Sequence, residues 1–416
     1  MAEEDNSTEK IEIIPSNWQK NESIITVIGV GGGGNNAVER MFHDGITDVN
    51  YMVCNTDKQV LESSEVPNKL QLGAILTKGL GAGCDPETGR KAALESLEQI
   101  KDFLADTTEM VFITCGMGGG TGTGASPVIA EAAKEKDLLV IGVVTLPFRD
   151  EGPAARNRAI GGLKEMQKHV DSLLVVDNNK LYDIYGSLKL NEAFSKADEV
   201  LSTAVRGITD VIHSHGFINM DFADVKMVMK NSGVALIGIG EGEGEGRAMT
   251  AVQQAFHSPL LNDLDLTTAG KALVNITYSE QNKGMKVEEL GQIMEYINNY
   301  TGNNSNFKRG LVNDPKAGDK VHVTVIATGF EMTSLPQYVQ VDDKDKIVIN
   351  ASETDDMYQT GVPLQKTLKG SNGAPKIHLK PGEKPALIIG EGESIENLEI
   401  EPAFKRRDRM IQQNAN

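Results

Sequence analysis

Cysteine is scarce in this sequence and is poorly spaced for structural chemistry. Only three cysteines occur, Cys54, Cys84 and Cys115, and none of them forms a Cys-x-x-Cys pair. This odd count argues against a disulfide framework and against a zinc site, and it favours reduced thiols in a cytoplasmic compartment.

Basic charge and aromatic residues are also in short supply. The chain has 41 Lys and Arg residues against 59 Asp and Glu residues, a net charge of −18, so we expect no nucleic-acid partner. Aromatic residues make up 5% of the chain, and the single tryptophan, Trp18, lies in a polar segment where we expect it to be exposed.

Long hydrophobic runs are absent. The longest strongly apolar run, residues 138–146, is too short to cross a bilayer and fits a buried parallel strand. Residues 1–21 lack the hydrophobic core of a signal peptide. We therefore expect no direct membrane insertion, so that any membrane association is indirect.

The P-loop pattern G-x-x-x-x-G-K-[ST] is missing, and no glycine-rich segment carries a lysine that could reach a phosphate. Any nucleotide phosphates must then be met by backbone N–H groups and by a hydrated Mg²⁺ that bridges phosphate oxygens. No cage of protein ligands for a metal is visible, so we predict no metal-ligating residues.

Glycine, by contrast, is concentrated in one segment, Gly-Gly-Gly-Thr-Gly-Thr-Gly at 118–124. An apolar strand is expected before it at 110–113, and a helix is expected after it at 125–136, with Pro127 in the first turn. Backbone N–H groups in such a loop can converge on an anion, and the helix dipole adds to the attraction. A tight turn would need only one or two of these glycines.

Two further glycine-rich segments occupy comparable places. Residues 29–36 follow a predicted strand at 24–28 and precede a helix from 37 to about 43, and residues 79–89 precede a predicted helix at 90–104. Further strands are expected at 50–54, 138–145 and 173–176, so the first half is predicted to be a doubly wound parallel sheet of the α/β class. The three glycine loops should lie at the carboxyl edge of that sheet, where ligands bind.

The rest of the chain suggests a second α/β domain and a tail. Apolar positions spaced by three and four predict a long helix at 190–213, and strands are expected at 234–239, 271–278 and 321–328. The glycine–glutamate run at 240–246 is predicted to be a flexible loop. The predicted domains are a disordered extension (1–22), a nucleotide-binding domain (23–189), a central helix (190–213), a second α/β domain (214–330), a disordered linker (331–393) and a docking peptide (394–416).

Several of these motifs, in this order, resemble the FtsZ family of tubulin-like bacterial cell-division GTPases. The resemblance covers about residues 23–330 and a tail segment, Ile400 to Lys405, that is similar to the family's docking peptide. The matching motifs are GVGGGGNNAV at 29–38, Asn-Thr-Asp at 55–57, GGGTGTG at 118–124 and Asn-x-Asp-x-Ala-Asp at 219–224.

The resemblance implies a site for GTP or GDP. The phosphates and ribose would lie along the residues of the first glycine loop, the β- and γ-phosphates would lie on the second, Glu151 would contact the ribose side, and Asp198 would accept hydrogen bonds from the guanine edge. The loop residues concerned are Gly32, Gly33, Gly34, Asn35, Asn36, Gly122, Thr123 and Gly124.

Asp221 and Asp224 are spaced for one face of a helix's first turn, where acids commonly cap the helix. The resemblance implies instead that they are catalytic and, with Asn219, reach the nucleotide of the next subunit and position the attacking water. This arrangement implies a head-to-tail filament, GTP hydrolysis at the subunit interface, and a ring scaffold at midcell. The tail would bind membrane-tethering or regulatory division proteins, although a frayed terminus is the simpler alternative.

One mismatch with the family's motif and two alternative functions stay open. The family's E-G-x-x-R pattern has Ala155 at the arginine position, with Arg156 and Arg158 nearby as substitutes. A dinucleotide oxidoreductase could use the G-x-G-x-x-G at 29–34, but Asp57 lies 28 residues after Gly29, somewhat late for a ribose contact. A tubulin-like regulator that binds GTP without hydrolysing it is the other alternative.

Overall fold

The computed structural model describes most of the chain up to residue 330. The described residues are 18, 22–104, 107–185, 189–213, 221–258, 271–281, 283–301, 307–330, 368–369 and 375–376. Asn219, the predicted linker apart from two short strands, and the predicted docking peptide lie outside them.

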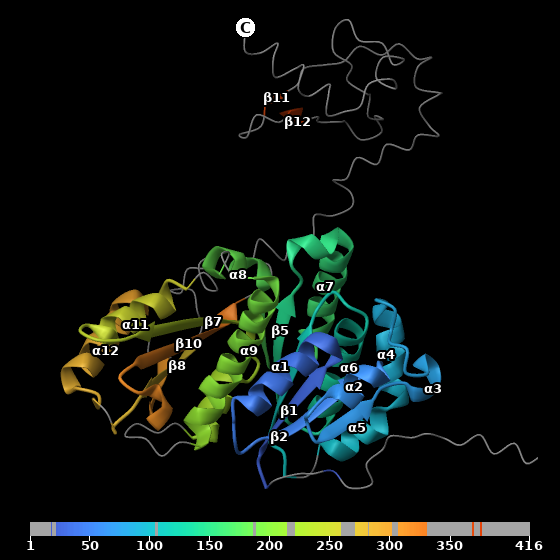
Figure 1. The fold of residues 1–416 in the computed structure, drawn as a ribbon, viewed down its shortest axis with the longest axis horizontal. Coiled ribbons are helices and arrows are strands. Elements are labelled where there is room, and N and C mark those ends of the chain that lie inside the picture. The colour runs from blue at the N-terminus through green and yellow to red at the C-terminus, as the bar shows by residue number, and fades with distance from the viewer. Residues whose placement is uncertain are drawn as a thin grey trace, which may run out of the picture. The chain divides into compact units, whose positions relative to one another are not determined.

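One ten-stranded sheet organises residues 22–330 (Figure 1). Its strand order is β3-β2-β1-β4-β5-β6-β7-β10-β8-β9. All pairings from β3 to β7 are parallel, whereas β10 is antiparallel to both β7 and β8. The strands are β1 (Ile25–Val30), β2 (Asn50–Asn55), β3 (Asn68–Gln71), β4 (Met110–Gly116), β5 (Leu139–Leu146), β6 (Ser172–Asp177), β7 (Gly233–Gly242), β8 (Lys271–Tyr278), β9 (Phe307–Asn313) and β10 (Val321–Phe330).

Helices cover both faces of this sheet. Alternate residues of β1 belong to two separate hydrophobic clusters, with Ile28 and Val30 in one and Ile25 and Val27 in the other. Burial on both sides explains why the strands are continuous apolar runs. The first cluster contains α4 (Pro86–Glu95), α5 (Leu97–Phe103), α6 (Thr121–Glu135), α7 (Gly152–Met166), α11 (Arg247–Phe256) and α12 (Val287–Thr301). The second contains α1 (Gly31–His43), α2 (Lys58–Ser63), α8 (Asn178–Tyr185), α9 (Leu190–His213) and α10 (Phe222–Met229).

The predicted doubly wound parallel sheet and the long helix are confirmed. Figure 1 shows α9 running between the N-terminal helices and the yellow and orange elements of the second half. The two halves of the sheet meet where β6 pairs with β7 over three residue pairs, Ser172 to Leu174 with Gly233 to Ala235. Strands β3 and β9 were not predicted, because both are rich in polar residues.

The starts of two helices were predicted wrongly. Helix α1 begins at Gly31 and α6 at Thr121, so most of each glycine segment is the first turn of a helix and not a loop. Pro127 consequently lies inside α6 and not in its first turn. Glycine has a low helix propensity, but close packing of these turns on neighbouring backbone overrides it.

The third glycine segment also differs from the prediction. It follows α3 (Ala74–Thr77), not a strand, and its last residues belong to α4, which starts at Pro86 because Asp85 accepts hydrogen bonds from the N–H groups of Glu87 and Thr88. The predicted helix at 90–104 is divided at Ser96 into α4 and α5.

Two polar segments are more ordered than expected. The first three of the seven residues in the glycine–glutamate run belong to β7, where a Cβ on Gly240 would lie 2.0 Å from the Ala251 carbonyl oxygen of α11. Trp18 is half-buried, and its ring packs edge-on against Phe103 with the centroids 5.1 Å apart. Within the predicted linker, β11 (Leu368–Lys369) pairs antiparallel with β12 (Pro375–Lys376).

Candidate nucleotide-binding site

A cavity of about 500 Å³ opens at the carboxyl edge of the parallel strands. Segments that follow β1, β4, β5 and β6 line it, together with the third turn of α9. Its lining residues are Gly32, Gly33, Asn36, Gly116, Met117, Gly119, Gly120, Thr121, Gly122, Thr145, Pro147, Glu151, Asn178, Ala197 and Asp198. Six predicted ligand residues, Gly32, Gly33, Asn36, Gly122, Glu151 and Asp198, are therefore brought together from four parts of the sequence.

The floor of the cavity is formed by the first turns of α1 and α6, which touch each other. Gly31 has φ of +73°, and a Cβ there would lie 2.8 Å from the Gly122 nitrogen. Neither helix has a side-chain cap. Two sets of first-turn N–H groups thus lie beside the cavity without capping oxygens, which is the arrangement that binds anions.

Two of the lining glycines have no packing reason to be glycine. A Cβ on Gly32 or Gly119 would meet nothing within 4 Å, and neither residue has a positive φ that requires glycine. A methyl group at either position would occupy the open space of the cavity wall. The absence of side chains here thus suits a ligand that approaches the backbone closely.

The other four predicted ligand residues do not line this cavity, and two of them, Thr123 and Gly124, line a separate one. A Cβ on Gly34 would lie 2.3 Å from the Thr114 carbonyl oxygen, and one on Gly124 would lie 1.8 Å from the Pro86 carbonyl oxygen. Asn35 is 2% exposed, and three backbone carbonyl oxygens lie within 3.1 Å of its side-chain amide, so its NH2 group is hydrogen-bonded within the protein. The Thr123 hydroxyl accepts a 2.8 Å hydrogen bond from the Gly118 N–H. These residues pack the first turns of α1 and α6 against the rest of the protein.

Sequence reasoning missed several polar residues of the wall. Asn178, the first residue after β6, is buried, and its side-chain oxygen has no hydrogen-bond partner. A buried orphan oxygen beside a cavity indicates a donor supplied by a ligand or by water. The Thr121 hydroxyl shares a 2.7 Å hydrogen bond with Thr56. The position of Asn178 at the carboxyl edge of the sheet was the available signal.

The charged side chains of the lining are both acidic. Glu151 is held in place because one carboxylate oxygen accepts a 2.8 Å hydrogen bond from the Phe148 N–H. Burial raises the pKa of Asp198 to about 7, and the nearby positive charge of Arg40 opposes that shift. Asp198 can therefore change its ionisation near neutral pH.

The two arginines that could substitute for an arginine at position 155 lie outside the lining of this cavity. The Arg158 guanidinium donates a 2.7 Å hydrogen bond from Nε to the Gly118 carbonyl oxygen and lines a separate cavity between α4, α6 and α7. Neither Arg156 nor Arg158 is among the residues that line the nucleotide cavity. Among the residues that line the cavity there is no Lys, Arg or His, so backbone groups and neutral or acidic side chains form its wall.

The predicted catalytic acids cap a helix elsewhere. The Asp221 carboxylate accepts a 2.8 Å hydrogen bond from the Asp224 N–H, and the Asp224 carboxylate accepts one from the Asp221 N–H. Lys308 lies 2.7 Å from the Asp224 carboxylate and holds its pKa below the usual value. Within the described ranges, no residue of α10 lines the cavity.

Neither a metal-binding cluster nor a membrane-spanning helix occurs among the described residues. Among them, no group of three or more His, Cys, Asp and Glu side chains is placed to hold a metal ion. No helix in the same part of the chain is long and apolar enough to cross a membrane.

Comparison with known proteins identifies the family. Residues 24–186 match the model of the GTPase domain of the Tubulin/FtsZ family, and residues 233–331 match the FtsZ family C-terminal domain. A cell division protein FtsZ from Porphyromonas gingivalis is 46% identical over 329 residues, which are 79% of this chain and 71% of that protein. The chain belongs to the FtsZ family. It is a tubulin-like GTPase that forms filaments for cell division.

Two other relatives of this FtsZ family member extend the match. The cell division protein FtsZ of Pseudomonas putida is 41% identical over 404 residues, 92% of this chain and 96% of that protein. The solved structure of an empty FtsZ dimer from M. jannaschii is 42% identical with a TM-score of 0.70, covering 75% of this chain and 89% of that chain. The oxidoreductase and the non-hydrolysing regulator find no support in these matches.

Proposed function

We propose that the cavity at the carboxyl edge binds GTP and GDP in a fixed orientation. Asp198 accepts hydrogen bonds from the adjacent N–H donors of guanine, a pair that adenine lacks, and Glu151 lies on the ribose side. Gly32, Gly33 and Gly122 lie along the phosphates. The observation that supports this proposal is that one cavity is lined both by two carboxylates, Glu151 and Asp198, and by the first turns of two helices without side-chain caps.

Magnesium fits this site through the nucleotide. The lining offers two carboxylates, Glu151 and Asp198, and Glu151 already accepts a backbone hydrogen bond. Mg²⁺ characteristically keeps several waters and binds substrate phosphates, so it needs few protein ligands. A cavity lined mainly by backbone and hydroxyl groups is therefore compatible with this ion. When bound, the ion supplies charge neutralisation on the phosphate oxygens.

The acid loop completes the site of a neighbouring subunit. From Asp198 to His213, the end of α9, the helix rises roughly 22 Å, and Asp221 follows seven residues outside the described ranges. One molecule therefore carries its nucleotide cavity and its acids toward different ends of α9. A head-to-tail contact joins the two parts, and a contact of that kind that does not close produces an open filament.

The two acids would have different tasks in this interface. Asp224 is paired with Lys308 and caps α10, so it fixes the loop. Asp221 is exposed and would orient the attacking water, a role that contributes on the order of 10²- to 10⁴-fold in rate. Asn219 would help to hold the γ-phosphate or that water.

Dilution provides the decisive test of the shared site. Phosphate release and light scattering are followed together with GTP, GDP or no nucleotide, over protein concentrations that span the assembly threshold. We expect release per molecule to fall to background when scattering disappears. A rate per molecule that stays constant in fully dispersed protein would refute the shared site.

The remaining proposals concern organisation and partners. We propose the domain boundaries given above, a cytoplasmic location at midcell, and docking of Ile400 to Lys405 on membrane-tethering or regulatory proteins. Deleting residues 396–416 should abolish capture of a purified tether while GTP hydrolysis is retained. Undiminished capture would remove the docking assignment alone.

A further inference from the structure

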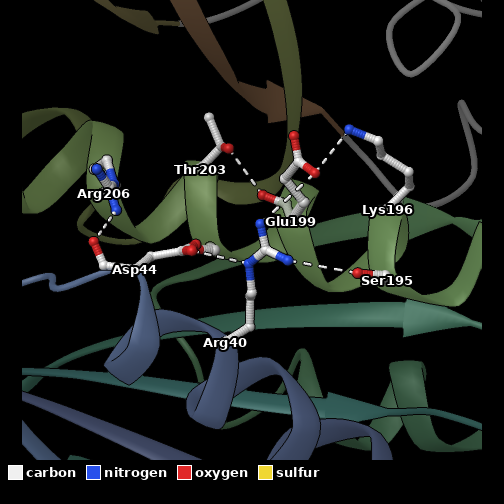
Figure 2. Close-up of polar contacts among 8 residues, drawn as sticks. Arg40, Asp44, Ser195, Lys196, Glu199, Thr203 and Arg206 are labelled. Carbon is white, nitrogen blue, oxygen red and sulfur yellow. Dashed lines mark hydrogen bonds and ion pairs between the residues drawn. The ribbon is translucent and has the colours of Figure 1, made fainter. Parts of the chain in front are cut away.

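The last turn of α1 is joined to α9 by a cluster of polar contacts that the nucleotide site does not explain (Figure 2). From the Arg40 guanidinium, Nε donates to Asp44 Oδ1 at 2.9 Å, Nη1 donates to Ser195 Oγ at 3.4 Å, and Nη2 lies 3.9 Å from Glu199 Oε2. Asp44 in turn accepts hydrogen bonds of 2.9 Å from the Ser202 hydroxyl and from Arg206 Nη2. We call Arg40, Asp44, Ser195, Glu199, Ser202 and Arg206 the α1–α9 clamp.

The α9 members of the clamp follow one face of the helix, with spacings of four, three and four residues. Asp198 lies within this stripe, three residues after Ser195 and four before Ser202. Figure 2 shows the Arg40 side chain extending from α1 into the middle of the α9 members. The clamp therefore holds the stretch of α9 that carries Asp198.

The other end of α1 is the floor of the nucleotide cavity. Gly32, Gly33 and Asn36 line the cavity, and Arg40 lies one helical turn after Asn36. A single short helix thus contacts the phosphate end of the cavity with its first turn and the Asp198 stripe with its last turn. Any displacement of α1 along its axis would therefore move both the first turn at the cavity and the contacts with the α9 stripe that contains Asp198.

We propose that Arg40 is a positioning residue for guanine recognition, which holds the turn of α9 that carries Asp198 at a fixed distance from the phosphate-binding turn of α1. This inference rests on the proposed assignment of Asp198 to the guanine edge.

The charges around Asp198 agree with this role. Burial disfavours the carboxylate and raises its pKa to about 7, and Arg40 is the charged group that lowers it. The other charged groups nearby are Asp44, which is ion-paired with Arg40 at 2.9 Å, Glu151, which lines the same cavity, and Lys196 and Glu199 on α9, which are joined by a 2.8 Å ion pair. Removing the Arg40 charge should leave less of Asp198 ionised at neutral pH.

The test is the pH dependence of GDP affinity in dispersed protein, measured by fluorescent GDP titration between about pH 5.5 and 8.5. Arg40→Gln should move the midpoint of this dependence up by about half to one pH unit. Arg40→Lys should restore most of the shift because it keeps the charge. The matched control is Lys189→Gln, which removes the same charge just before the start of α9, outside the clamp, and should leave the midpoint unchanged.

An Asp198→Asn variant distinguishes the proposed role of Arg40 from the assignment of Asp198 to the guanine edge. If Asp198→Asn removes the pH dependence but Arg40→Gln keeps the original midpoint, Arg40 has no such role and the guanine assignment stands. If Asp198→Asn keeps the original dependence, both assignments fall. A general loss of affinity in Arg40→Gln without a change of midpoint, unrelieved by Arg40→Lys, would show a purely structural role and overturn the proposal.

Discussion

Replacing Gly32 by alanine should separate stability from nucleotide binding, because the two effects have opposite signs. Gly32 is the second residue of α1, has no positive φ, and has room for a Cβ. Alanine is favoured over glycine in a helix by up to about 1 kcal/mol, so the free energy of unfolding should rise by roughly 0.5–1 kcal/mol.

The same methyl group should weaken binding. It would stand in the cavity wall, where the phosphates must approach the backbone closely. Displacing a phosphate from one charge-assisted hydrogen bond costs about 1.5–3 kcal/mol, which corresponds to roughly a 10- to 150-fold loss of GDP affinity.

The matched control is Gly34→Ala, two residues further along α1. A Cβ there would lie 2.3 Å from the Thr114 carbonyl oxygen, so we expect a loss of about 1–3 kcal/mol in stability. Chemical denaturation without nucleotide and GDP titration measure the two quantities for each variant. If Gly32→Ala binds GDP as tightly as the parent chain, the phosphates do not lie on this turn and the orientation proposed above is wrong.

Three further predictions follow from particular contacts. Because the pKa of Asp198 in the nucleotide-free protein is raised to about 7, GDP affinity should be about tenfold lower at pH 6 than at pH 8. The folded state favours the protonated form of Asp198, so the contribution of this residue to stability should be lost as the pH rises through 7. Asp198→Asn should flatten both pH profiles, measured by GDP titration and by chemical denaturation. Asp221→Ala should retain GTP binding and assembly by light scattering but stop phosphate release, at a cost of about 0.5–2 kcal/mol for the lost cap; normal turnover would exclude Asp221 from catalysis. Arg247 is 2% exposed and paired with Glu289 at 2.7 Å, so Arg247→Met should cost about 3 kcal/mol in denaturation while GDP affinity is kept, and a change under 1 kcal/mol would contradict this.

Much of the architecture follows from hydrophobic pattern alone. The strands buried on both faces are uninterrupted apolar runs, and α9 has regular spacings of three and four, so both were predictable. Strands β3 and β9 were not, because Asn68–Gln71 and Phe307–Asn313 carry polar and charged residues and obtain their place from neighbouring strands. The early starts of α1 and α6 contradict glycine's helix propensity, and only the tertiary contacts explain them.

The site was predictable as a set of motifs but not residue by residue. A glycine motif contains residues that must lack a side chain for packing, such as Gly34 and Gly124, and residues that need not, such as Gly32. The one-letter sequence does not separate these classes, whereas the space available for a Cβ does. Asn178 was missed because its unpartnered oxygen is a property of the folded wall.

The uncapped turns of α1 and α6 have a consequence for how this site can be adjusted. If main-chain atoms recognise the anion, exchanging one polar side chain for another does not retune that recognition directly, and a side chain added at Gly32 can only obstruct it. The available control is the placement of whole helices, so changes far from the nucleotide, at the distal end of α1, become the natural means of setting how firmly it is held.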